Sequence, residues 1–547
     1  MKQRRSWLLL LTLIFLLPMS GRGQQKPPRL VVMLVVDQMR ADHLTRFSGI
    51  FRHGFARIAK NAAIYTNAHH EHAYTVTGAG HATIATGAFP AHNGIVNNDW
   101  YDKKLGRNVY CCEDTSAALI GFPQLKPSKG RSAQNLLTST LGDWLKTQSP
   151  ESKVYGVAKK DRASILSTGM KADGAYWFDS DNASGNIITS KFYGDTIPEW
   201  VNAFNRSRRV DSYFDAGWQK LKGEETYFLA REDTFPGEAG GDSTFFPHSF
   251  KAGSAAPDKK YYDKLTTSPF HEQLMLAFAK TLVENTGIGS DEAPDLLFLG
   301  ASACDAIGHE YGPLSQESMD YFLRLDEYLG DFFDFLDARI GAENYLIALG
   351  SDHGVLPLPE ELQRRGIPAR RLPPGQLKQD IENVFLRVGQ ELGIGENYFL
   401  RSMGYSLYLD YDVAQRYGVD PQTLDQALAA QIRQIEGVAD VYTKADLAPA
   451  AGEQRPYQAR HRNSFHPERT GDLMLRLKEF YLSRSSMTGT THGSTYDYDT
   501  HVPIVFSGPG ISAGVYDQKV RTVDIAPTLA KLFGITPPEG IDGVALF

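Results

Sequence analysis

The sequence predicts an α/β protein whose mainly parallel central sheet is sandwiched between helices. Five largely apolar runs lie along the chain, at residues 31–37, 153–161, 295–305, 345–353 and 502–510. These runs are continuous rather than alternating, which is typical of strands that are buried on both faces of a sheet. Helical patterns lie between the runs, and strands that alternate with helices indicate an α/β fold.

The clearest helical pattern covers residues 315–340. Ser315 is a suitable N-cap because its hydroxyl can accept a hydrogen bond from a backbone amide of the first turn. Five apolar residues then recur at helical spacing and predict one buried face: Phe322, Leu325, Leu329, Phe332 and Leu336. We therefore expect a long helix with this face in the core.

A stretch from about residue 360 to 485 breaks the alternation of strands and helices. Asp420 and Pro421 are a favourable N-cap and first residue for a helix that we expect to stop at Gly437. The order of strand, helix, strand and strand predicts a small α+β subdomain at residues 360–485, inserted into a domain of residues 24–547.

The N-terminus resembles a cleavable secretory signal, which we assign to residues 1–23. A basic MKQRR segment precedes an apolar run from Trp7 to Met19, and small and polar residues follow. A helix needs roughly 20 apolar residues to span a bilayer, so this run is too short for a span, and a membrane anchor is the weaker alternative. We expect an exported protein, periplasmic or secreted, with no membrane span after cleavage.

Composition and charge limit the classes of function. The 547 residues are 42% hydrophobic and 22% charged, which is ordinary for a soluble globular protein. Residues 1–23 contain Lys2, Arg4, Arg5 and Arg22 but no acid, so their removal shifts the formal net charge from −7 to −11. Such an acidic protein is poorly suited to bind nucleic acid or anionic membranes, and an anionic substrate would need local positive charge.

The cysteines do not indicate a disulfide framework. Only Cys111, Cys112 and Cys304 are present. The adjacent Cys111 and Cys112 could pair in an exported protein, but a vicinal disulfide is strained. We therefore expect inert thiols.

Three of the predicted strands end in an aspartate, at Asp37, Asp305 and Asp352. Ligands of open α/β sheets bind beyond the carboxyl ends of the strands, so these carboxylates can converge on one cleft. His309 follows Asp305 at a spacing that faces one side of a helical turn, and His353 directly follows Asp352. A single aspartate at a strand end is more often a cap or turn residue. The joint pattern nevertheless predicts a site for zinc or a similar first-row ion.

Other histidines and two cations are weaker signals on their own. His492 stands in a Gly/Thr loop, where a lone histidine is usually solvated. The HHEH segment at residues 69–72 is interpreted as an effect of composition, because no predicted strand end positions it. Lys160 and Arg162 follow a predicted strand and could clamp an anion, and the alternative is an exposed turn.

Taken in order, these motifs resemble those of the alkaline phosphatase superfamily, and most closely the exported phosphate-irrepressible (PafA-type) alkaline phosphatases. The matching motifs are VDQM at Asp37, TGAGH at Thr77, NNDW at Asn97, KDR at Lys160, DAIGH at Asp305, SDHG at Asp352 and THG at His492. The resemblance extends from about residue 30 to the C-terminus, where residues 520–535 also look like the family. The set is highly specific, although GxGH or SDH alone would be weak.

The resemblance implies a role for each matching residue. One zinc ion would be held by Asp37, Asp352 and His353, and it would bind the hydroxyl of the nucleophile, Thr77. A second zinc ion would be held by Asp305, His309 and His492. The phosphoryl oxygens would be contacted by Asn98, Lys160 and Arg162, although the neighbouring Asn97 leaves a one-residue ambiguity.

The implied activity is that of a broad-specificity alkaline phosphatase, which hydrolyses phosphate monoesters through a phosphothreonine intermediate and acts as a monomer. A helix at Gly78–Thr86 would aim backbone amides at the phosphate. In the same stretch, His81 is interpreted as a packing residue or a support of the ligands. We expect the inserted segment to border the active-site mouth, because it begins after His353 and ends before His492.

Several alternatives are weaker. A phosphodiesterase or nucleotide pyrophosphatase of the same superfamily would share the metals and the threonine, but Lys160 and Arg162 favour a doubly charged monoester. A sulfatase would need a Cys or Ser nucleophile in a C/S-x-P-x-R motif, which this sequence lacks. Export argues against a phosphoglycerate mutase. A non-catalytic metal- or phosphate-binding relative would have lost Thr77 or a ligand, and all are present.

Overall fold

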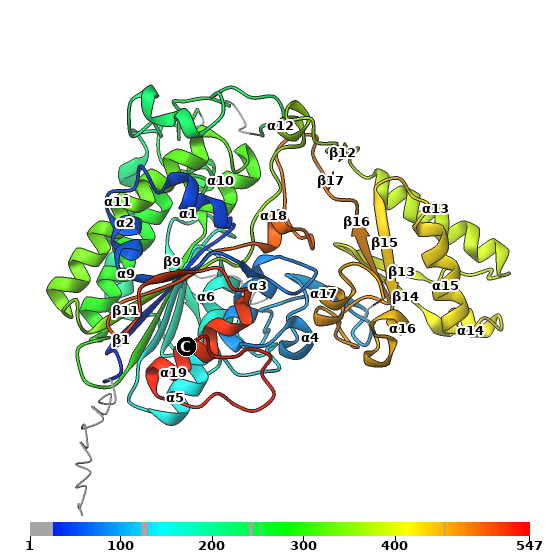
Figure 1. The fold of residues 1–547 in the computed structure, drawn as a ribbon, viewed down its shortest axis with the longest axis horizontal. Coiled ribbons are helices and arrows are strands. Elements are labelled where there is room, and N and C mark those ends of the chain that lie inside the picture. The colour runs from blue at the N-terminus through cyan, green and yellow to red at the C-terminus, as the bar shows by residue number, and fades with distance from the viewer. Residues whose placement is uncertain (1–25, 122–129, 240–243, 252, 453) are drawn as a thin grey trace, which may run out of the picture.

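The computed structural model describes residues 26–121, 130–239, 244–251, 253–452 and 454–547. A large sheet with helices on both faces forms one body, and a smaller sheet with its own helices extends to one side of it (Figure 1). The expected signal at residues 1–23 lies outside the described residues. Within the described ranges, no helix has both the length and the apolar character that a bilayer span requires.

The large sheet has ten strands in the order β19-β2-β18-β11-β1-β10-β7-β8-β9-β6. In that order, their bounds are Gly514–Tyr516, Ala62–Tyr65, Ile504–Ser507, Tyr345–Gly350, Leu30–Val36, Asp295–Ala301, Val154–Ala158, Gly174–Phe178, Ile187–Ser190 and Leu119–Ile120. The middle of the sheet, from β11 to β8, is parallel, as the continuous apolar runs predict. The α/β prediction is therefore confirmed.

The edges of the sheet differ from the expected parallel arrangement. Strand β18 forms within the apolar run 502–510 but pairs antiparallel with β11 and β2, and β9 pairs antiparallel with β8. Continuous hydrophobicity reports burial on both faces and carries no information on strand direction. The chain reaches β18 from the smaller body through the single turn of α18 (Asp497–Thr500), so no crossover helix imposes parallel pairing.

Alternate residues of β1 define the two faces of the large sheet. Leu34 lies in a buried cluster with α9 and α11, whereas Met33 lies in a second cluster with α5 and α19. Both faces of the strand are therefore covered, which explains why its sequence is apolar throughout. The bounds of these helices are Pro269–Thr286 for α9, Gln316–Arg339 for α11, Leu141–Gln148 for α5 and Ile525–Phe533 for α19.

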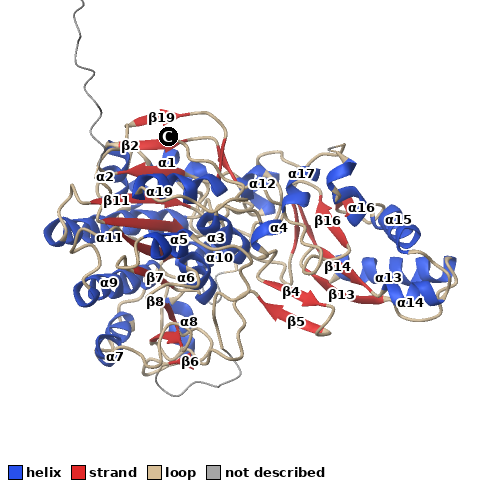
Figure 2. Ribbon diagram, turned by 90° about the horizontal axis from the view of Figure 1, so that it is seen from below, coloured by secondary structure: helices blue, strands red, loops and turns tan. Residues whose placement is uncertain are grey.

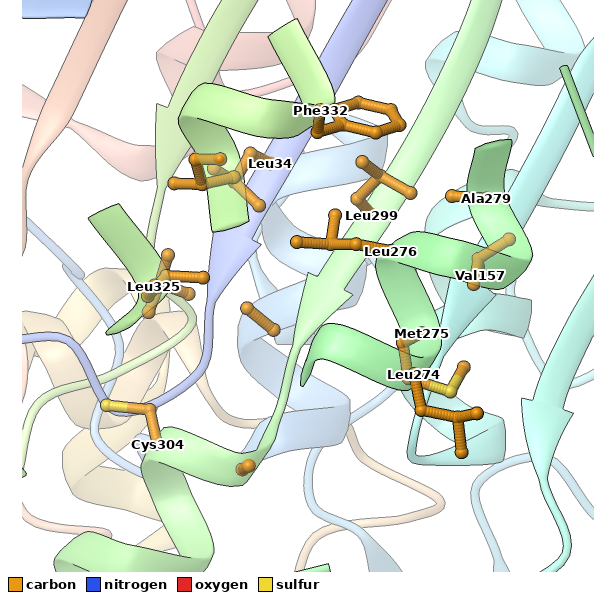
Figure 3. Packing of buried hydrophobic residues seen from close by; sticks show 14 of the residues in the cluster. Leu34, Val157, Leu274, Met275, Leu276, Ala279, Leu299, Cys304, Leu325 and Phe332 are labelled. Carbon is orange, nitrogen blue, oxygen red and sulfur yellow. The ribbon is translucent and has the colours of Figure 1, made fainter. Parts of the chain in front are cut away.

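The long helix predicted at residues 315–340 is α11. Ser315 is its N-cap, and the Ser315 hydroxyl accepts a hydrogen bond from the backbone amide of Ser318 at 3.0 Å. The predicted apolar face is buried, and Figure 3 shows Phe332 packed on the side of the sheet that carries Leu34. The prediction of this helix and of its buried face is confirmed.

The smaller body contains a four-stranded antiparallel sheet in the order β13-β14-β16-β15. Helices α13 and α15 pack on this sheet and form a hydrophobic core with it that is separate from the cores of the large body. Strands β12 and β17 pair in parallel where the chain enters and leaves this body. The bounds are Arg370–Leu372 for β12, Gln376–Glu391 for α13, Phe399–Met403 for β13, Ser406–Leu409 for β14, Tyr411–Arg416 for α14, Pro421–Ile432 for α15, Val438–Thr443 for β15, Leu473–Leu477 for β16 and Tyr481–Ser483 for β17.

Helix α15 begins where the sequence predicts but ends earlier. The Asp420 carboxylate accepts hydrogen bonds from two backbone amides of the first turn, each at 3.0 Å. The helix ends at Ile432, so the predicted end at Gly437 was wrong. Turns occupy the intervening residues, and the Arg433 Nε donates to Asp440 Oδ1 at 3.0 Å, which joins this turn to β15.

The remaining elements surround the two sheets. Figure 2 shows the β4–β5 hairpin of the large body beside β13 of the smaller one, so the two bodies touch there. The three cysteines are free and buried, as expected of inert thiols. The remaining bounds are Ala41–Phe47 for α1, Gly54–Lys60 for α2, Ala68–His69 for β3, Thr77–Thr86 for α3, Pro90–Asn93 for α4, Asp99–Asp102 for β4, Arg107–Tyr110 for β5, Asp161–Thr168 for α6, Glu199–Arg206 for α7, Lys259–Leu265 for α8, Ala303–Tyr311 for α10, Pro359–Arg364 for α12, Lys444–Leu447 for α16, Gln458–Asn463 for α17 and Val520–Arg521 for β20.

Candidate active site

The residues predicted to bind metal and phosphate meet at the carboxyl edge of the parallel strands. Asp37 directly follows β1, Asp352 lies two residues beyond β11, and Lys160 lies two residues beyond β7. Neighbouring parallel strands end at the same edge of a sheet, which is why residues far apart in the sequence lie together here. Asp37 and Asp352 are completely buried, so their carboxylates face protein groups rather than bulk water.

The first predicted ligand set, Asp37, Asp352 and His353, is brought together by the fold. Ligand atoms of the three residues lie within 4.8 Å of one another. The Nε2 atom of His353 is 3.5 Å from Asp37 Oδ1 and 3.4 Å from Asp352 Oδ2. The Nδ1 atom of His353 lies 3.0 Å from the carbonyl oxygen of Gly354. Nδ1 therefore carries the proton, and the lone pair of Nε2 faces the two carboxylates.

The atoms of this set that face one another have no hydrogen-bond partner. Asp37 Oδ1, Asp352 Oδ2 and His353 Nε2 are all buried and make no hydrogen bond, although Asp352 Oδ2 lies 3.1 Å from His81 Nδ1, which bonds to the carbonyl oxygen of Thr77 instead. A buried polar atom without a partner costs free energy, and two unpaired carboxylate oxygens in one place cost more. Oxygen and imidazole nitrogen ligands are those that zinc takes in proteins, so the residues present fit a bound zinc ion.

The second predicted set contains Asp305, His309 and His492. The Nε2 atoms of His309 and His492 lie 3.1 Å and 3.4 Å from Asp305 Oδ1. The Nδ1 atom of His309 is 2.9 Å from the carbonyl oxygen of Thr490, and that of His492 is 2.7 Å from the carbonyl oxygen of Thr75. Both histidines are thus held with Nε2 toward the carboxylate, as in the first set.

Two details of the second set differ from the sequence prediction. Asp305 is not at a strand end; it lies in the first turn of α10, one turn before His309 on the same helix face. The side chains whose ligand atoms all lie within 4.8 Å are Asp305, His353 and His492, and His309 approaches them through Asp305. The rings of His353 and His492 stack with centroids 3.5 Å apart, so His353 lies between the two sets.

Thr77 is the first residue of α3 and is 1% exposed. The helix starts one residue earlier than predicted, and the two glycines that follow let its first turn approach other chain segments closely. A Cβ atom at Gly80 would lie 2.2 Å from the carbonyl oxygen of Asp352. The amide of Gly78 donates to Asn98 Oδ1 at 2.7 Å. Asn98, rather than Asn97, is therefore the asparagine that contacts the start of this helix.

Lys160 joins the two ligand sets to Thr77. Its Nζ lies 2.6 Å from Asp37 Oδ2, 2.7 Å from Asp305 Oδ2 and 3.1 Å from Thr77 Oγ1. Burial opposes the charge of this lysine, but Asp305 and Asp37 outweigh burial and raise the pKa of Lys160. The ammonium group is therefore a fixed positive charge beside the Thr77 hydroxyl.

Arg162 lies in the first turn of α6 and contacts a different partner. Its Nη1 is 3.4 Å from the Tyr110 hydroxyl, and its buried Nε has no hydrogen-bond partner. Tyr110 in turn donates to Asp161, the residue between Lys160 and Arg162. Lys160 therefore contacts Thr77 directly, whereas Arg162 contacts Tyr110 through Nη1 and keeps an unpartnered Nε.

Charge in the site is unevenly distributed. Burial, and then repulsion from Asp352, raise the pKa of Asp37 well above its ordinary value. Burial acts in the same direction on Asp305, but His309 and Lys160 outweigh it and hold the pKa of Asp305 well below the usual range. The protein groups around Asp37 therefore leave its charged form disfavoured, and a bound cation would favour that form.

Gln38 is a residue that the sequence reasoning missed. It is 1% exposed, and its φ of 67° places a residue with a side chain in the left-handed region. Its backbone amide donates to Asp352 Oδ1 at 3.2 Å, and its Nε2 donates to Asp305 Oδ1 at 2.7 Å. Gln38 therefore links the two ligand sets. The available signal was its place directly after Asp37, where a buried polar side chain needs a partner.

Two histidines outside the ligand sets, His81 and His70, contact the segments that carry Thr77 and Asp352. The Nδ1 atom of His81 lies 3.0 Å from the carbonyl oxygen of Thr77 and 3.1 Å from Asp352 Oδ2, in keeping with the supporting role expected for it. The interpretation of the HHEH segment as an effect of composition was wrong. His70 is fully buried, and its Nε2 lies 2.9 Å from the carbonyl oxygen of Ser351, so it holds the segment that carries Asp352.

A cavity of about 430 Å³ opens beside the site. His492 and Asn97 line it from the large body, and Leu377 and Ser402 line it from the smaller body. The segment that breaks the strand–helix alternation therefore forms one wall of the space next to the second ligand set. Val76, the residue before Thr77, also lines this space.

Comparisons with known proteins place the chain in a family. Residues 31–499 match the family described as type I phosphodiesterase / nucleotide pyrophosphatase. The chain is 34% identical over 543 residues to alkaline phosphatase PafA of Elizabethkingia meningoseptica, covering 97% of each protein. It is 33% identical over 528 residues to alkaline phosphatase PhoV of Synechococcus elongatus, covering 94% of this chain and 92% of that relative. The crystal structure of wild-type alkaline phosphatase PafA matches with a TM-score of 0.87 and 32% identity, over 95% of this chain and 98% of that one.

These matches agree with the resemblance that the motifs indicate. The family match covers most of the chain, and the two relatives align with it over nearly their whole lengths. The structural match extends the agreement to the whole fold, including the smaller body. The chain therefore belongs to the type I phosphodiesterase / nucleotide pyrophosphatase family, and within it to the PafA-type alkaline phosphatases, and it is a phosphatase.

Proposed function

We propose that this protein is an exported, broad-specificity alkaline phosphatase that hydrolyses phosphate monoesters through a phosphothreonine intermediate at a two-zinc site. The observation that carries the proposal is the position of Thr77. Its hydroxyl lies 3.1 Å from the Lys160 ammonium, which itself contacts one carboxylate of each ligand set. The proposed nucleophile Thr77, the positive charge of Lys160 and the two ligand sets therefore lie together in one buried region.

The ligand sets define where zinc would be held. Asp37, Asp352 and His353 would hold one ion, and Asp305, His309 and His492 would hold the other. Bound zinc would lower the pKa of the threonine hydroxyl and of a water molecule and would stabilise negative charge on the phosphoryl group. The unpartnered atoms of the first set and the Nε2 orientation of all three histidines support this assignment.

Thr77 supplies the nucleophilic oxygen. Its Oγ1 forms a bond to phosphorus while the bond between phosphorus and the alcohol oxygen breaks, and the hydroxyl proton ends on the departing alcohol. The oxygen of a water molecule then bonds to phosphorus while the bond from phosphorus to Thr77 Oγ1 breaks, one water proton ends on Oγ1, and inorganic phosphate is released. Phosphoryl transfer passes through a loose transition state, so the placement of charge does most of the catalysis.

Three side chains would position the phosphoryl group. Because Oδ1 of Asn98 accepts from the Gly78 amide, the donors on its Nδ2 remain for a phosphoryl oxygen. Lys160 would contribute a point charge next to the attacking oxygen, and the free Nε of Arg162 would contribute a directed donor.

A phosphodiesterase is the second candidate, because the family description includes phosphodiesterases and nucleotide pyrophosphatases. The two functions differ in the charge on the transferred group, since a monoester carries one negative charge more than a diester. The cations Lys160 and Arg162 suit the more highly charged group. We therefore place monoester hydrolysis first.

Three further assignments belong to the same proposal. Residues 1–23 act as a cleaved export signal, and the mature catalytic domain is residues 24–547. Residues 360–485 act as an inserted subdomain that forms one wall of the active-site mouth, which the lining of the cavity supports. The enzyme acts as a monomer on small phosphate esters.

The test is a steady-state comparison of an aryl phosphate monoester with a matched aryl methyl phosphate diester. We expect kcat/KM to be higher for the monoester, to vanish when a chelator removes the metal, and to return on addition of zinc. A higher kcat/KM for the diester would refute the monoesterase assignment. Full activity after exhaustive chelation would refute the two-zinc site.

A further inference from the structure

The cavity beside the second ligand set is lined by two positively charged side chains and, among the described residues, by no carboxylate. Lys378 and Arg484 are among its lining residues, and no Asp or Glu is found among the described residues that line it. The whole chain has a formal net charge of −7, so a lining of this kind is not the average character of the protein surface. A cavity that concentrates one sign of charge attracts ligands of the opposite sign.

Two backbone carbonyl groups beside the second ligand set hold Arg484 at this cavity. Its Nη1 donates to the carbonyl oxygens of His309 and Thr490, at 2.9 Å and 2.8 Å. A Cβ atom at Gly489 would lie 2.1 Å from this Nη1, so glycine at that position leaves the space that the guanidinium occupies. The arginine is therefore held in one orientation at the edge of the catalytic site.

No carboxylate of the described residues forms an ion pair with Arg484. Both hydrogen-bond partners are neutral carbonyl groups, and Glu310 favours the charge of Arg484 only from beyond ion-pair distance. The nearby Arg371 differs, because it forms an ion pair with Glu360 at 2.9 Å. The recorded bonds use only Nη1 of Arg484, which leaves the donors on Nε and Nη2 for a group in the cavity.

The other walls of the cavity suit the organic portion of a substrate. Lys378 lies near the start of α13, and its ion pair with Glu382, at 3.8 Å, joins an exposed lysine to a partly exposed glutamate. Tyr74, Leu377 and Ile381 contribute apolar surface to the lining of the cavity. The cavity volume of about 430 Å³ is large enough to hold more than a phosphate group.

We propose that Arg484, assisted by Lys378, binds a second anionic group carried on the alcohol portion of the phosphate ester. This inference rests on the proposed phosphomonoesterase function and names the substrate class of that site: monoesters whose leaving group bears a carboxylate or a second phosphate. The fork of Arg484 matches the paired oxygens of either anion, and the apolar wall accommodates the carbon skeleton between the two ends.

The test uses two substrates of nearly identical shape, 4-carboxyphenyl phosphate and its neutral amide, 4-carbamoylphenyl phosphate. Both are assayed with the zinc-loaded full-length enzyme and its Arg484→Gln variant. We expect the wild-type enzyme to prefer the carboxylate over the amide, mainly through KM. A charge-assisted hydrogen bond at a partly buried position predicts that Arg484→Gln lowers this preference roughly tenfold. Intrinsic differences in leaving-group chemistry cancel in the ratio.

Matched variants separate recognition from structural support. Arg484→Lys keeps a positive charge and should retain part of the preference. Arg371→Gln changes an arginine of the same region, whose Nη1 donates to the Gly489 carbonyl at 2.7 Å. Because Arg371 repels the charge of Arg484 and does not line the cavity, this variant should not lower the preference. Lys378→Gln should lower it only about twofold, because exposed ion pairs contribute little.

Several outcomes would overturn the inference. Equal losses on both substrates in Arg484→Gln would show that the arginine only supports the segment that carries His309. An unchanged preference would show that the anion does not reach it. If the wild-type enzyme hydrolyses the neutral amide but does not prefer the carboxylate, the subsite is wrong and the phosphatase function stands. If it hydrolyses neither ester, the proposed function itself fails.

Discussion

Replacement of Gln38 by methionine tests whether the hydrogen bond from Gln38 to Asp305 helps to position the two ligand sets relative to each other. Methionine has nearly the length of glutamine but cannot donate a hydrogen bond, and the backbone bond from residue 38 to Asp352 remains. The lost bond joins Nε2 to the charged Asp305 carboxylate at 2.7 Å, in a place where the side chain is 1% exposed. Hydrogen bonds to charged groups contribute about 1.5–3 kcal/mol, and burial places this one toward the upper end.

Two measurements follow from this magnitude. The metal-free Gln38→Met chain should lose about 1.5–3 kcal/mol of its free energy of unfolding, measured by urea denaturation followed by circular dichroism. Zinc binding, measured by competition with a chelator, should weaken roughly 10–100-fold, because residues that orient ligands have effects of that size. Gln38→Gly is the matched control. It removes the same bond but also the left-handed strain of a residue with φ of 67°, so its loss of stability should be no larger.

The reasoning would be refuted if Gln38→Met bound zinc within about twofold of the wild-type affinity and unfolded at the same urea concentration. That pair of results would show that Asp305 keeps its position without the glutamine. A loss of stability with unchanged zinc affinity would show that Gln38 supports the fold alone.

Three other predictions concern the nucleophile, the cations and a buried carboxyl group. Thr77→Ala should abolish nearly all phosphatase activity, while atomic absorption still finds about two zinc ions per chain; full residual turnover would exclude Thr77 as the nucleophile. Joint replacement of Lys160 and Arg162 by alanine should reduce monoester hydrolysis far more than diester hydrolysis, and equal losses would count against a charge clamp. Burial raises the pKa of Glu317 from 4.5 to about 8. The folded state therefore favours the neutral form of Glu317. The contribution of this group to the free energy of unfolding is full below about pH 4.5 and is lost as the pH rises through about 8. Glu317→Gln should therefore flatten the decline in the free energy of unfolding between pH 5 and pH 9, by an amount on the order of a few kcal/mol, and parallel pH profiles would contradict this.

The sequence predicted the features that depend on local spacing. The continuous apolar runs correspond to buried strands, because a strand covered on both faces has no position where a polar side chain is solvated. The spacing of Asp305 and His309 corresponds to one face of α10, because residues one helical turn apart project to the same side. The Ser315 N-cap is equally local, because its hydroxyl bonds to an amide only three residues away.

Other features depend on segments that are distant in the sequence. The antiparallel pairing of β18 depends on the route of the chain through the smaller body. The orientation of His492 depends on the carbonyl oxygen of Thr75, and the role of His70 depends on the carbonyl oxygen of Ser351. In each case the partner is a backbone atom, which has no side-chain signature that the sequence could show.

The sequence alone therefore determined the α/β class of this protein, the position of its long helix and, through its motifs, the residue types of its candidate site. These follow from periodicity and from short-range spacing, which the chain carries directly. Only the tertiary structure decided that Gln38 spans both ligand sets and that Lys160 rather than Arg162 contacts Thr77. It also decided that Arg484 lines a cavity in which none of the described lining residues is a carboxylate. Charge and hydrogen bonding act through distance in space, and that distance is set only when the strands and loops are packed together.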